Sequence, residues 1–340
     1  MEPAPQLKIT GSEPSSKPGG IRPMRAARLV APRRVEVSEA PLPHPSSTEV
    51  RIRVEGCGIC GSNLALWQGR PWFSYPLDPG EGGHEGWGEI HALGEAVHGL
   101  RLGERVAFLS NHAFAEYDLA DSAQIVSAPP HSDVFPGEAI GCAVNILRRS
   151  AVAQGQTVVV IGIGFLGALL VQLATRKGAR VIAVSRRRSA RDVARRCGAV
   201  AAIPFDRPEA VAAELREITG NTTCKRVIEA AGAQASLDLA TALTGEYGRL
   251  IIAGYHQDGP RHVDMQLWNW RAIDVINAHE RNAITSTDGM REAAALIERN
   301  ALDPSILYTH SFAIDELSEA FKVLERRPEG FLKAWIRTAA

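Results

Sequence analysis

The chain has 340 residues, enough for two compact domains, and its hydrophobic content of 45% is ordinary for a globular enzyme. Lysine plus arginine and aspartate plus glutamate each total 38, so no overall charge attracts nucleic acid or a membrane surface. The longest apolar run, 158–171, is interrupted by glycines and is shorter than the roughly 20 residues that span a bilayer. A small-molecule partner is therefore expected, with no nucleic acid and no membrane.

Residues 1–24 are rich in proline, serine and glycine and lack the apolar segment of a secretory signal, which predicts a flexible tail. The five cysteines are odd in number and unevenly spaced, which argues against a disulfide scaffold. A reducing, cytoplasmic setting is expected.

Residues 25–145 are predicted to be rich in β-structure. Short segments that alternate apolar and polar residues are separated by turn residues, and they predict strands at 50–54, 88–90, 105–108 and 114–117.

Two glycine-rich turns in this part carry metal-binding residue types. Residues 56–63 read GCGICGSN, and residues 82–86 read GGHEG. Thiolate and imidazole groups are ligands that tetrahedral zinc recruits, and a catalytic site adds a third protein ligand and an open position. Cys57 and Cys60 have no second cysteine pair, so a closed four-cysteine site is not expected. The alternative is two small buried thiols beside a surface histidine.

Residues 146–279 are predicted to form a parallel sheet with crossover helices, because strands at 158–161, 181–184, 226–229 and 249–253 alternate with amphipathic segments. The first strand runs into a glycine-rich turn and then into a predicted helix at 168–177, as in dinucleotide-binding units. Gly162 permits the bend, Gly164 admits a diphosphate and Gly167 lets the helix pack closely. The turn that binds the cofactor consists of Gly162, Gly164, Phe165, Leu166 and Gly167.

The second strand of this unit ends in Ser185, followed by Arg186, Arg187 and Arg188. Dinucleotide sites specific for NAD place an acidic residue here. A hydroxyl and guanidinium groups suit a 2′-phosphate instead, so NADP(H) is expected in preference to NAD(H). The alternative is a solvated basic start to the next helix, with the specificity residue elsewhere.

Near the C-terminus, an apolar stripe at helical spacing follows Asp315, which predicts a helix capped by this residue. A last strand is predicted at 332–336.

Three ordered motifs, CGICGS, GHEG and the glycine turn, resemble those of medium-chain dehydrogenases/reductases of the zinc-dependent alcohol and polyol dehydrogenase type, across about residues 24–340. The resemblance implies an α/β protein. A GroES-like catalytic domain would comprise 25–145 and be completed by 280–340, and a Rossmann NADP-binding domain, 146–279, would be inserted between them. The active site would lie in the cleft between the domains, and a homodimer or homotetramer is expected.

The same resemblance assigns ligands to one catalytic zinc. Cys60 and His84 match two of the family's ligands, and Cys57 becomes a neighbour that does not bind. Residues 138–145, EAIGCAVN, resemble the polyol dehydrogenase pattern whose glutamate belongs to the zinc site, so Glu138 is the expected third ligand and Cys142 the less favoured one. Glu85 is the acid that can exchange at the metal in this family; alternatively it only hydrogen-bonds a ligand.

The chain departs from the family pattern at several positions. Asn63 stands where an aspartate usually orients the zinc histidine, and Ala65 where many relatives carry a proton-relaying histidine. Proton delivery is then expected through Ser62 or water. The four-cysteine lobe that holds a structural zinc is missing, so no structural zinc is expected.

The favoured hypothesis is a zinc-dependent, NADP(H)-linked oxidoreductase that interconverts a secondary or polyol-like alcohol and its aldehyde or ketone. Its catalytic group would be Cys60, Ser62, His84 and Glu85. One alternative, motivated by Asn63 and Ala65, is a reductase of an activated C=C or C=N bond with absent or non-catalytic zinc. Another is a non-enzymatic cofactor-binding protein, against which the intact ligand set argues.

Overall fold

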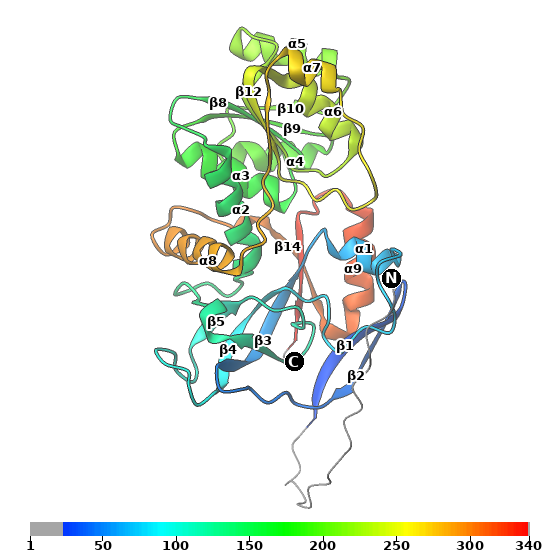
Figure 1. Cartoon of the computed structure of the whole chain (residues 1–340), viewed down its shortest axis with the longest axis vertical. Coiled ribbons are helices and arrows are strands. Elements are labelled where there is room, and N and C mark those ends of the chain that lie inside the picture. The colour runs from blue at the N-terminus through cyan, green and yellow to red at the C-terminus, as the bar shows by residue number, and fades with distance from the viewer. Residues whose placement is uncertain (1–22, 339–340) are drawn as a thin grey trace, which may run out of the picture.

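The computed structural model describes residues 23–338, arranged as two domains stacked along the long axis of the molecule (Figure 1). The predicted flexible tail therefore lies outside the described residues, except for its last two positions. Of these, Met24 already begins the first strand, because it pairs with Ala40 in a β-hairpin.

The catalytic domain is built on a seven-stranded sheet. Six of its strands follow the order β14-β15-β3-β4-β5-β7, and the seventh, β6, pairs with β3. A separate hairpin, β1 and β2, packs beside it. The elements of this N-terminal part are β1 (Met24–Ala31), β2 (Arg34–Ala40), β3 (Glu49–Ile59), α1 (Asn63–Gln68), β4 (Glu85–Leu93), β5 (Arg105–Phe108), β6 (Tyr117–Asp121) and β7 (Ile125–Ser127).

Most predicted strands of this part match observed ones, because alternating residues of β3 and β5 are buried against a common core. The strand predicted at 114–117 is misplaced. Phe114 and Ala115 are fully buried but irregular, and the regular strand β6 begins only at Tyr117. The apolar residues of this segment fill the core without joining a continuous ladder.

The second domain is a six-stranded parallel sheet with the order β10-β9-β8-β11-β12-β13, the doubly wound order of a Rossmann fold. Helices cover both faces of its central strands, so Val158 to Ile161 are fully buried and read as one apolar run. Its elements are β8 (Thr157–Ile161), α3 (Phe165–Arg176), β9 (Arg180–Ser185), α4 (Arg188–Arg196), β10 (Ala201–Pro204), α5 (Pro208–Thr219), β11 (Cys224–Glu229), α6 (Gln234–Leu243), β12 (Thr244–Ile252), α7 (Met265–Trp270) and β13 (Asp274–Asn277).

Two helices, α2 (Gly137–Ser150) and α8 (Ala283–Glu298), lie side by side between the two sheets (Figure 1). They approach closely at glycines: a Cβ at Gly141 would lie 2.7 Å from the backbone nitrogen of Met290. α2 starts in the catalytic domain and runs across the predicted boundary at residue 145, so one continuous helix connects the domains.

The C-terminal segment returns to the catalytic domain through β14 (Tyr308–Ala313), α9 (Leu317–Arg326) and β15 (Lys333–Arg337). β15 inserts between β14 and β3, so the last strand of the chain lies beside the CGICGS segment. Asp315 does not cap α9 as predicted. Its carboxylate pairs with Arg25, and a short 3-10 turn (Ile314–Glu316) leads into the helix. Among residues 23–338, no helix is long and apolar enough to cross a bilayer.

Candidate metal and cofactor site

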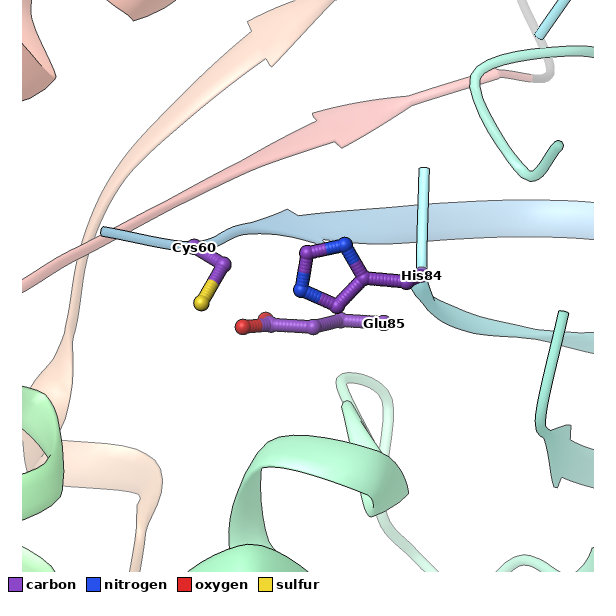
Figure 2. Close-up of side chains that lie close together, drawn as sticks. All are labelled: Cys60, His84 and Glu85. Carbon is purple, nitrogen blue, oxygen red and sulfur yellow. The ribbon is translucent and has the colours of Figure 1, made fainter. Parts of the chain in front are cut away.

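Three of the predicted site residues meet at one edge of the catalytic-domain sheet. Cys60 follows β3, His84 precedes β4, and Glu85 is the first residue of β4. One ligand atom from each lies within 4.8 Å of the other two, and Figure 2 shows the thiol, the imidazole and the carboxylate side by side. This spacing and mixture of sulfur, nitrogen and oxygen donors fit a zinc ion.

The backbone holds the imidazole of His84 with one nitrogen facing the other ligands. Its Nδ1 lies 3.1 Å from the carbonyl oxygen of Gly82, which can only accept a hydrogen bond. Nδ1 therefore carries the proton, and Nε2 is free to bind metal. The hydroxyl of Ser62 lies 3.5 Å from Nε2.

Asn63 does not contact the histidine ring as its place in the motif predicts. Its Oδ1 accepts a hydrogen bond from the backbone N–H of Cys60 at 2.9 Å, and its Nδ2 donates to the Gly82 carbonyl at 2.9 Å. The buried amide thus joins the two turns that carry Cys60 and His84, and it orients the histidine only through Gly82. An amide can do this because it both donates and accepts.

The site has a negative potential. Burial alone would lower the pKa of His84, but the Cys60 sulfur, Glu138 and Glu85 outweigh it and raise this pKa to about 10. The groups that hold a proton on this imidazole would equally stabilise a metal cation in its place.

The negative charge of Glu85 is balanced by a buried lysine, Lys333, which was not among the residues predicted from the sequence. The Nζ of Lys333, on β15, donates to Glu85 Oε1 at 2.6 Å and to the carbonyl of Ile59 at 3.2 Å. Both side chains are at most 5% exposed, and a Cβ at Gly58 would lie only 1.9 Å from Glu85 Oε2. A lysine in the predicted last strand, otherwise apolar at 331–336 (FLKAWI), was the available signal.

Glu138 and Cys142 lie one turn apart on α2 and contribute to the same potential, but neither belongs to the group within 4.8 Å. Burial raises the pKa of the Glu138 carboxyl, while His84 opposes the rise. Burial and the neighbouring Glu138 and Cys60 raise the pKa of the Cys142 thiol.

The glycine turn of the Rossmann domain lines a cleft that opens beside the metal-binding group. Gly162 has a φ of 93°, as the bend requires, and a Cβ at Gly167 would lie 2.0 Å from the Gly162 carbonyl oxygen. No atom lies within 4 Å of a Cβ built on Gly164, so a ligand can approach the backbone there. The cleft is lined by both domains: Ile161, Gly162, Ile163, Gly164, Val184, Ser185, Arg186, Arg187, Phe205, Ala230, Ala231, Ala233, Ala235, Ser236, Glu325, Arg326 and Arg327.

The predicted cofactor arginines differ in what they contact. Arg187 donates to the carbonyls of Phe331 and, at 3.4 Å, Ile163, so its guanidinium joins the two domains. The side chain of Arg186 makes no hydrogen bond or ion pair with any residue in 23–338 and lines the open cleft.

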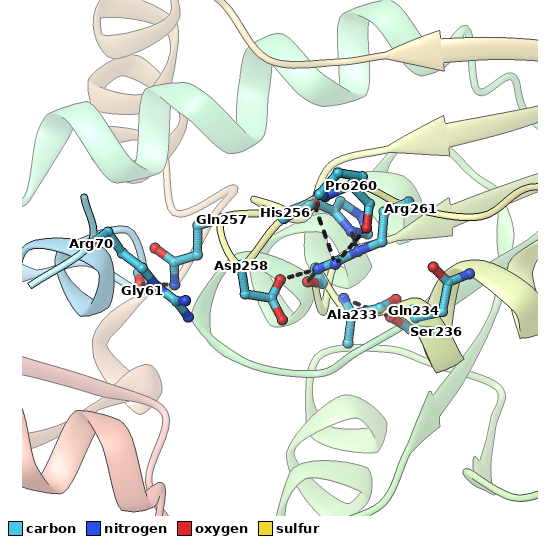
Figure 3. Close-up of polar contacts among 12 residues, drawn as sticks. Gly61, Arg70, Ala233, Gln234, Ser236, His256, Gln257, Asp258, Pro260 and Arg261 are labelled. Carbon is cyan, nitrogen blue, oxygen red and sulfur yellow. Dashed lines mark hydrogen bonds and ion pairs between the residues drawn. The ribbon is translucent and has the colours of Figure 1, made fainter. Parts of the chain in front are cut away.

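A loop after β12 forms a second connection across the cleft (Figure 3). Gln257 Nε2 donates to the carbonyl of Gly61 at 3.1 Å. The loop is held in shape by His256, whose Nδ1 accepts from Arg261 Nε at 2.8 Å and whose Nε2 donates to the buried Glu229 at 3.0 Å. Burial would raise the pKa of Glu229, but hydrogen bonds from His256, Ser236 and two backbone amides lower it.

The fold and the sequence both match known families. Residues 46–161 match the alcohol dehydrogenase GroES-like domain, and residues 166–299 match the zinc-binding dehydrogenase family. The sorbitol dehydrogenase of Homo sapiens is 26% identical over 326 residues, which cover 84% of this chain and 88% of that protein.

Two further similarities extend over nearly the whole chain. The 2-dehydro-3-deoxy-L-galactonate 5-dehydrogenase of Pseudoalteromonas atlantica is 24% identical over 348 residues, covering 93% of this chain and 99% of that protein. The structure of a candidate zinc-binding dehydrogenase from Sinorhizobium meliloti, solved with bound NADP, is similar to this chain with a TM-score of 0.80 and 25% sequence identity. The match covers 93% of this chain and 100% of that one.

Proposed function

Because this chain belongs to the zinc-binding medium-chain alcohol dehydrogenase family, we propose that it interconverts a secondary alcohol or polyol and its carbonyl compound with NADP(H). It is an NAD(P)-dependent oxidoreductase acting on CH–OH groups, so the alternative of a non-enzymatic cofactor-binding protein is wrong. The family equally disfavours the alternative of a C=C or C=N reductase.

The proposed zinc ligands are Cys60, His84 Nε2 and Glu138, with Glu85 beside them. This assignment is supported by charge: the thiolate and the Glu138 carboxylate balance a divalent cation, while Lys333 already balances Glu85. The buried Glu85 would then lie beside the metal with its charge already balanced by Lys333. One zinc per chain is proposed, without a structural zinc.

When bound, zinc polarises the substrate oxygen and the nicotinamide exchanges hydride with the substrate carbon. The chain's own residues hold and move the proton. Ser62 Oγ, 3.5 Å from His84 Nε2, is placed to accept the hydroxyl proton and pass it to water. Ala65 offers no further relay group, so proton release depends on solvent entering the cleft.

The substrate class is proposed from the relatives. Their names describe sorbitol, L-galactonate and a keto-deoxy galactonate as substrates, all of which carry neighbouring hydroxyl groups. A polyol or sugar acid oxidised at a secondary alcohol is therefore the proposed substrate of this chain.

The cofactor is proposed to be NADP(H), with its 2′-phosphate on Ser185 and Arg186. The guanidinium of Arg186, just after β9, has no partner among residues 23–338, which supports this choice, and the absence of an acidic residue in the 185–188 segment removes the usual NAD contact.

A homo-oligomer is proposed through the free edge of the Rossmann sheet. β13 is the edge strand, and the nearby Trp270 and Tyr247 side chains are 83% and 78% exposed. Exposed aromatic residues beside an unpaired strand are typical of subunit contacts. Sedimentation analysis tests this: a dimer or tetramer is expected, and a monomer at micromolar concentration would contradict it.

The proposed function is carried by one observation: Cys60, His84 and Glu85 converge within 4.8 Å beside the dinucleotide cleft. The test is a screen of polyols, sugar acids and simple secondary alcohols with NADP⁺ and NAD⁺. The reaction is monitored by the absorbance of the NAD(P)H that forms. Oxidation of a polyol or sugar acid is expected. Turnover restricted to enones or imines in the reductive direction would contradict the proposal.

A further inference from the structure

A segment of the catalytic domain, Arg327 to Phe331, lies against the Rossmann domain at the mouth of the dinucleotide cleft. Ser189, in the first turn of α4, donates its backbone N–H to Glu329 at 2.7 Å and accepts from the Gly330 N–H at 3.1 Å. Arg187 donates to the Phe331 carbonyl. These contacts at Glu329, Gly330 and Phe331 hold the segment against the Rossmann domain.

The segment begins with an arginine that has no protein partner. Arg327 ends α9 in a left-handed conformation, with a φ of 46°, and its side chain lines the cleft. Its guanidinium makes no hydrogen bond or ion pair with any residue in the described part of the chain. Desolvation and the positive charge of the nearby Arg186 lower the pKa of Arg327, and both side chains line the cleft.

The position of Arg327 along the cleft can be read from its neighbours. A Cβ on Gly61, the residue after Cys60, would lie 3.6 Å from Arg327 Nη2. Arg327 also lies near Arg187, which bonds to Ile163 in the glycine turn. Arg327 therefore lies between the metal-binding group and the adenosine end of the cleft. A dinucleotide that spans these ends places its diphosphate between them.

We infer that Arg327 binds the diphosphate of the nicotinamide cofactor from the catalytic-domain side, opposite the backbone N–H groups at the start of α3. This inference rests on the proposed dinucleotide function. An anion there would relieve the repulsion between the guanidinium groups and tie both domains to one ligand.

The test compares Arg327→Gln, Arg327→Gly and Arg327→Lys with Lys322→Gln, a control that removes an exposed charge from the same helix. Dissociation constants are measured by calorimetry for NADPH, NADH and ADP-ribose, which all contain the diphosphate, and for adenosine 2′,5′-bisphosphate, which lacks it. Arg327→Gln and Arg327→Gly should weaken the first three by about 10- to 100-fold and by the same factor. Binding of the bisphosphate should weaken by a smaller factor in the same two variants. Arg327→Lys should bind the three diphosphate ligands more tightly than Arg327→Gln does, though less tightly than wild type.

A change in folding is separated from a change in binding by Arg327→Gly. Glycine favours the left-handed conformation at this helix end, so the melting temperature of the unliganded variant should stay the same or rise while affinity falls. Unchanged affinities in Arg327→Gln would overturn the inference. So would a loss confined to NADPH and the bisphosphate, which would assign Arg327 to the 2′-phosphate. A wild-type protein that binds NADH as well as NADPH would overturn only the cofactor preference, because the Arg327 effect is also measured on NADH and ADP-ribose.

Discussion

The two ends of the cleft carry opposite charge, and they differ in whether that charge is paired within the protein. At the metal end, the acidic Glu85 is buried and paired with Lys333, and the remaining thiol and carboxylate groups surround His84. At the cofactor end, Arg186 and Arg327 face the open cleft without a protein partner among the described residues. A buried charge needs an opposite charge inside the protein, whereas an exposed charge is solvated by water until a ligand binds. The difference shows how one cleft can attract a cation at one end and phosphates at the other.

The largest expected effect comes from removing the thiol at the metal end. Cys60→Ser should lower kcat/KM by about a thousandfold, because several kcal/mol of transition-state stabilisation depend on the metal. Cys197→Ala, which removes a buried thiol in the Rossmann domain, is the control and should keep its activity. Steady-state kinetics with the best polyol from the screen decide the matter, and near-normal turnover in Cys60→Ser would show that the thiol is not a ligand.

The next effect tests the compensation of the buried acid. Lys333→Met should reduce the free energy of unfolding by about 3–5 kcal/mol at neutral pH, because it leaves the Glu85 carboxylate buried and unpaired. The double variant Lys333→Met/Glu85→Gln should recover most of this loss. Urea denaturation measures both. A loss below about 1 kcal/mol in the single variant would mean that Glu85 is not held as an ion in the folded protein.

At the cofactor end, Arg186→Gln should raise the KM for NADPH by about tenfold or more while the KM for NADH stays within about twofold. The reason is that only NADPH presents a 2′-phosphate at the end of β9. Arg188→Gln, at the exposed first residue of α4, is the matched control. Equal effects on both cofactors would place Arg186 elsewhere along the dinucleotide.

The smallest effect concerns an exposed ion pair on α9. Hydrogen bonds from Arg33 and Gln68 lower the pKa of Glu325 from its ordinary 4.5 to about 2. A lowered pKa stabilises the fold above pH 4.5, and this stabilisation is lost as the pH falls from about 4.5 through about 2. Glu325→Gln should therefore be less stable than wild type at pH 7, by less than about 1 kcal/mol because the pair is half-exposed, and the gap should narrow below pH 4.5. Urea titrations of both proteins at about pH 7 and about pH 3.5 test this. A stability difference between variant and wild type that is larger at the acidic pH than at neutral pH would contradict the lowered pKa of Glu325.

The Rossmann half could be predicted closely from the sequence because its information is local. Three of the four predicted strands there, among them 158–161 and 181–184, lie within observed strands, and the fourth, 249–253, runs one residue past the end of β12. The catalytic half depends on pairings between distant segments. The segment 114–117 was predicted as a strand from its short pattern of apolar and polar residues, but Phe114 is buried in the core around Phe321 and not in a ladder.

The site shows the same limit. Cys60, His84 and Glu85 could be found because glycine-rich motifs mark them. Lys333 lies 248 residues from its partner Glu85, and only the insertion of β15 beside β3 brings them together. Arg187 and Arg186 are neighbours in a basic run, and the sequence could not tell which would face the cleft and which would bond to the opposite domain. Arg327 carries no motif at all.

The measurement that tests the central claim most directly is the zinc content of the purified, extensively dialysed protein. About one zinc per chain is predicted, retained in Cys142→Ala and lost in Glu138→Gln. A protein without zinc that still binds and oxidises NADPH would contradict the account, because the ligands at the metal end would then serve no metal. Two zinc ions per chain would contradict the single-site proposal and direct attention to the surface group of Asp78, Glu81 and His112.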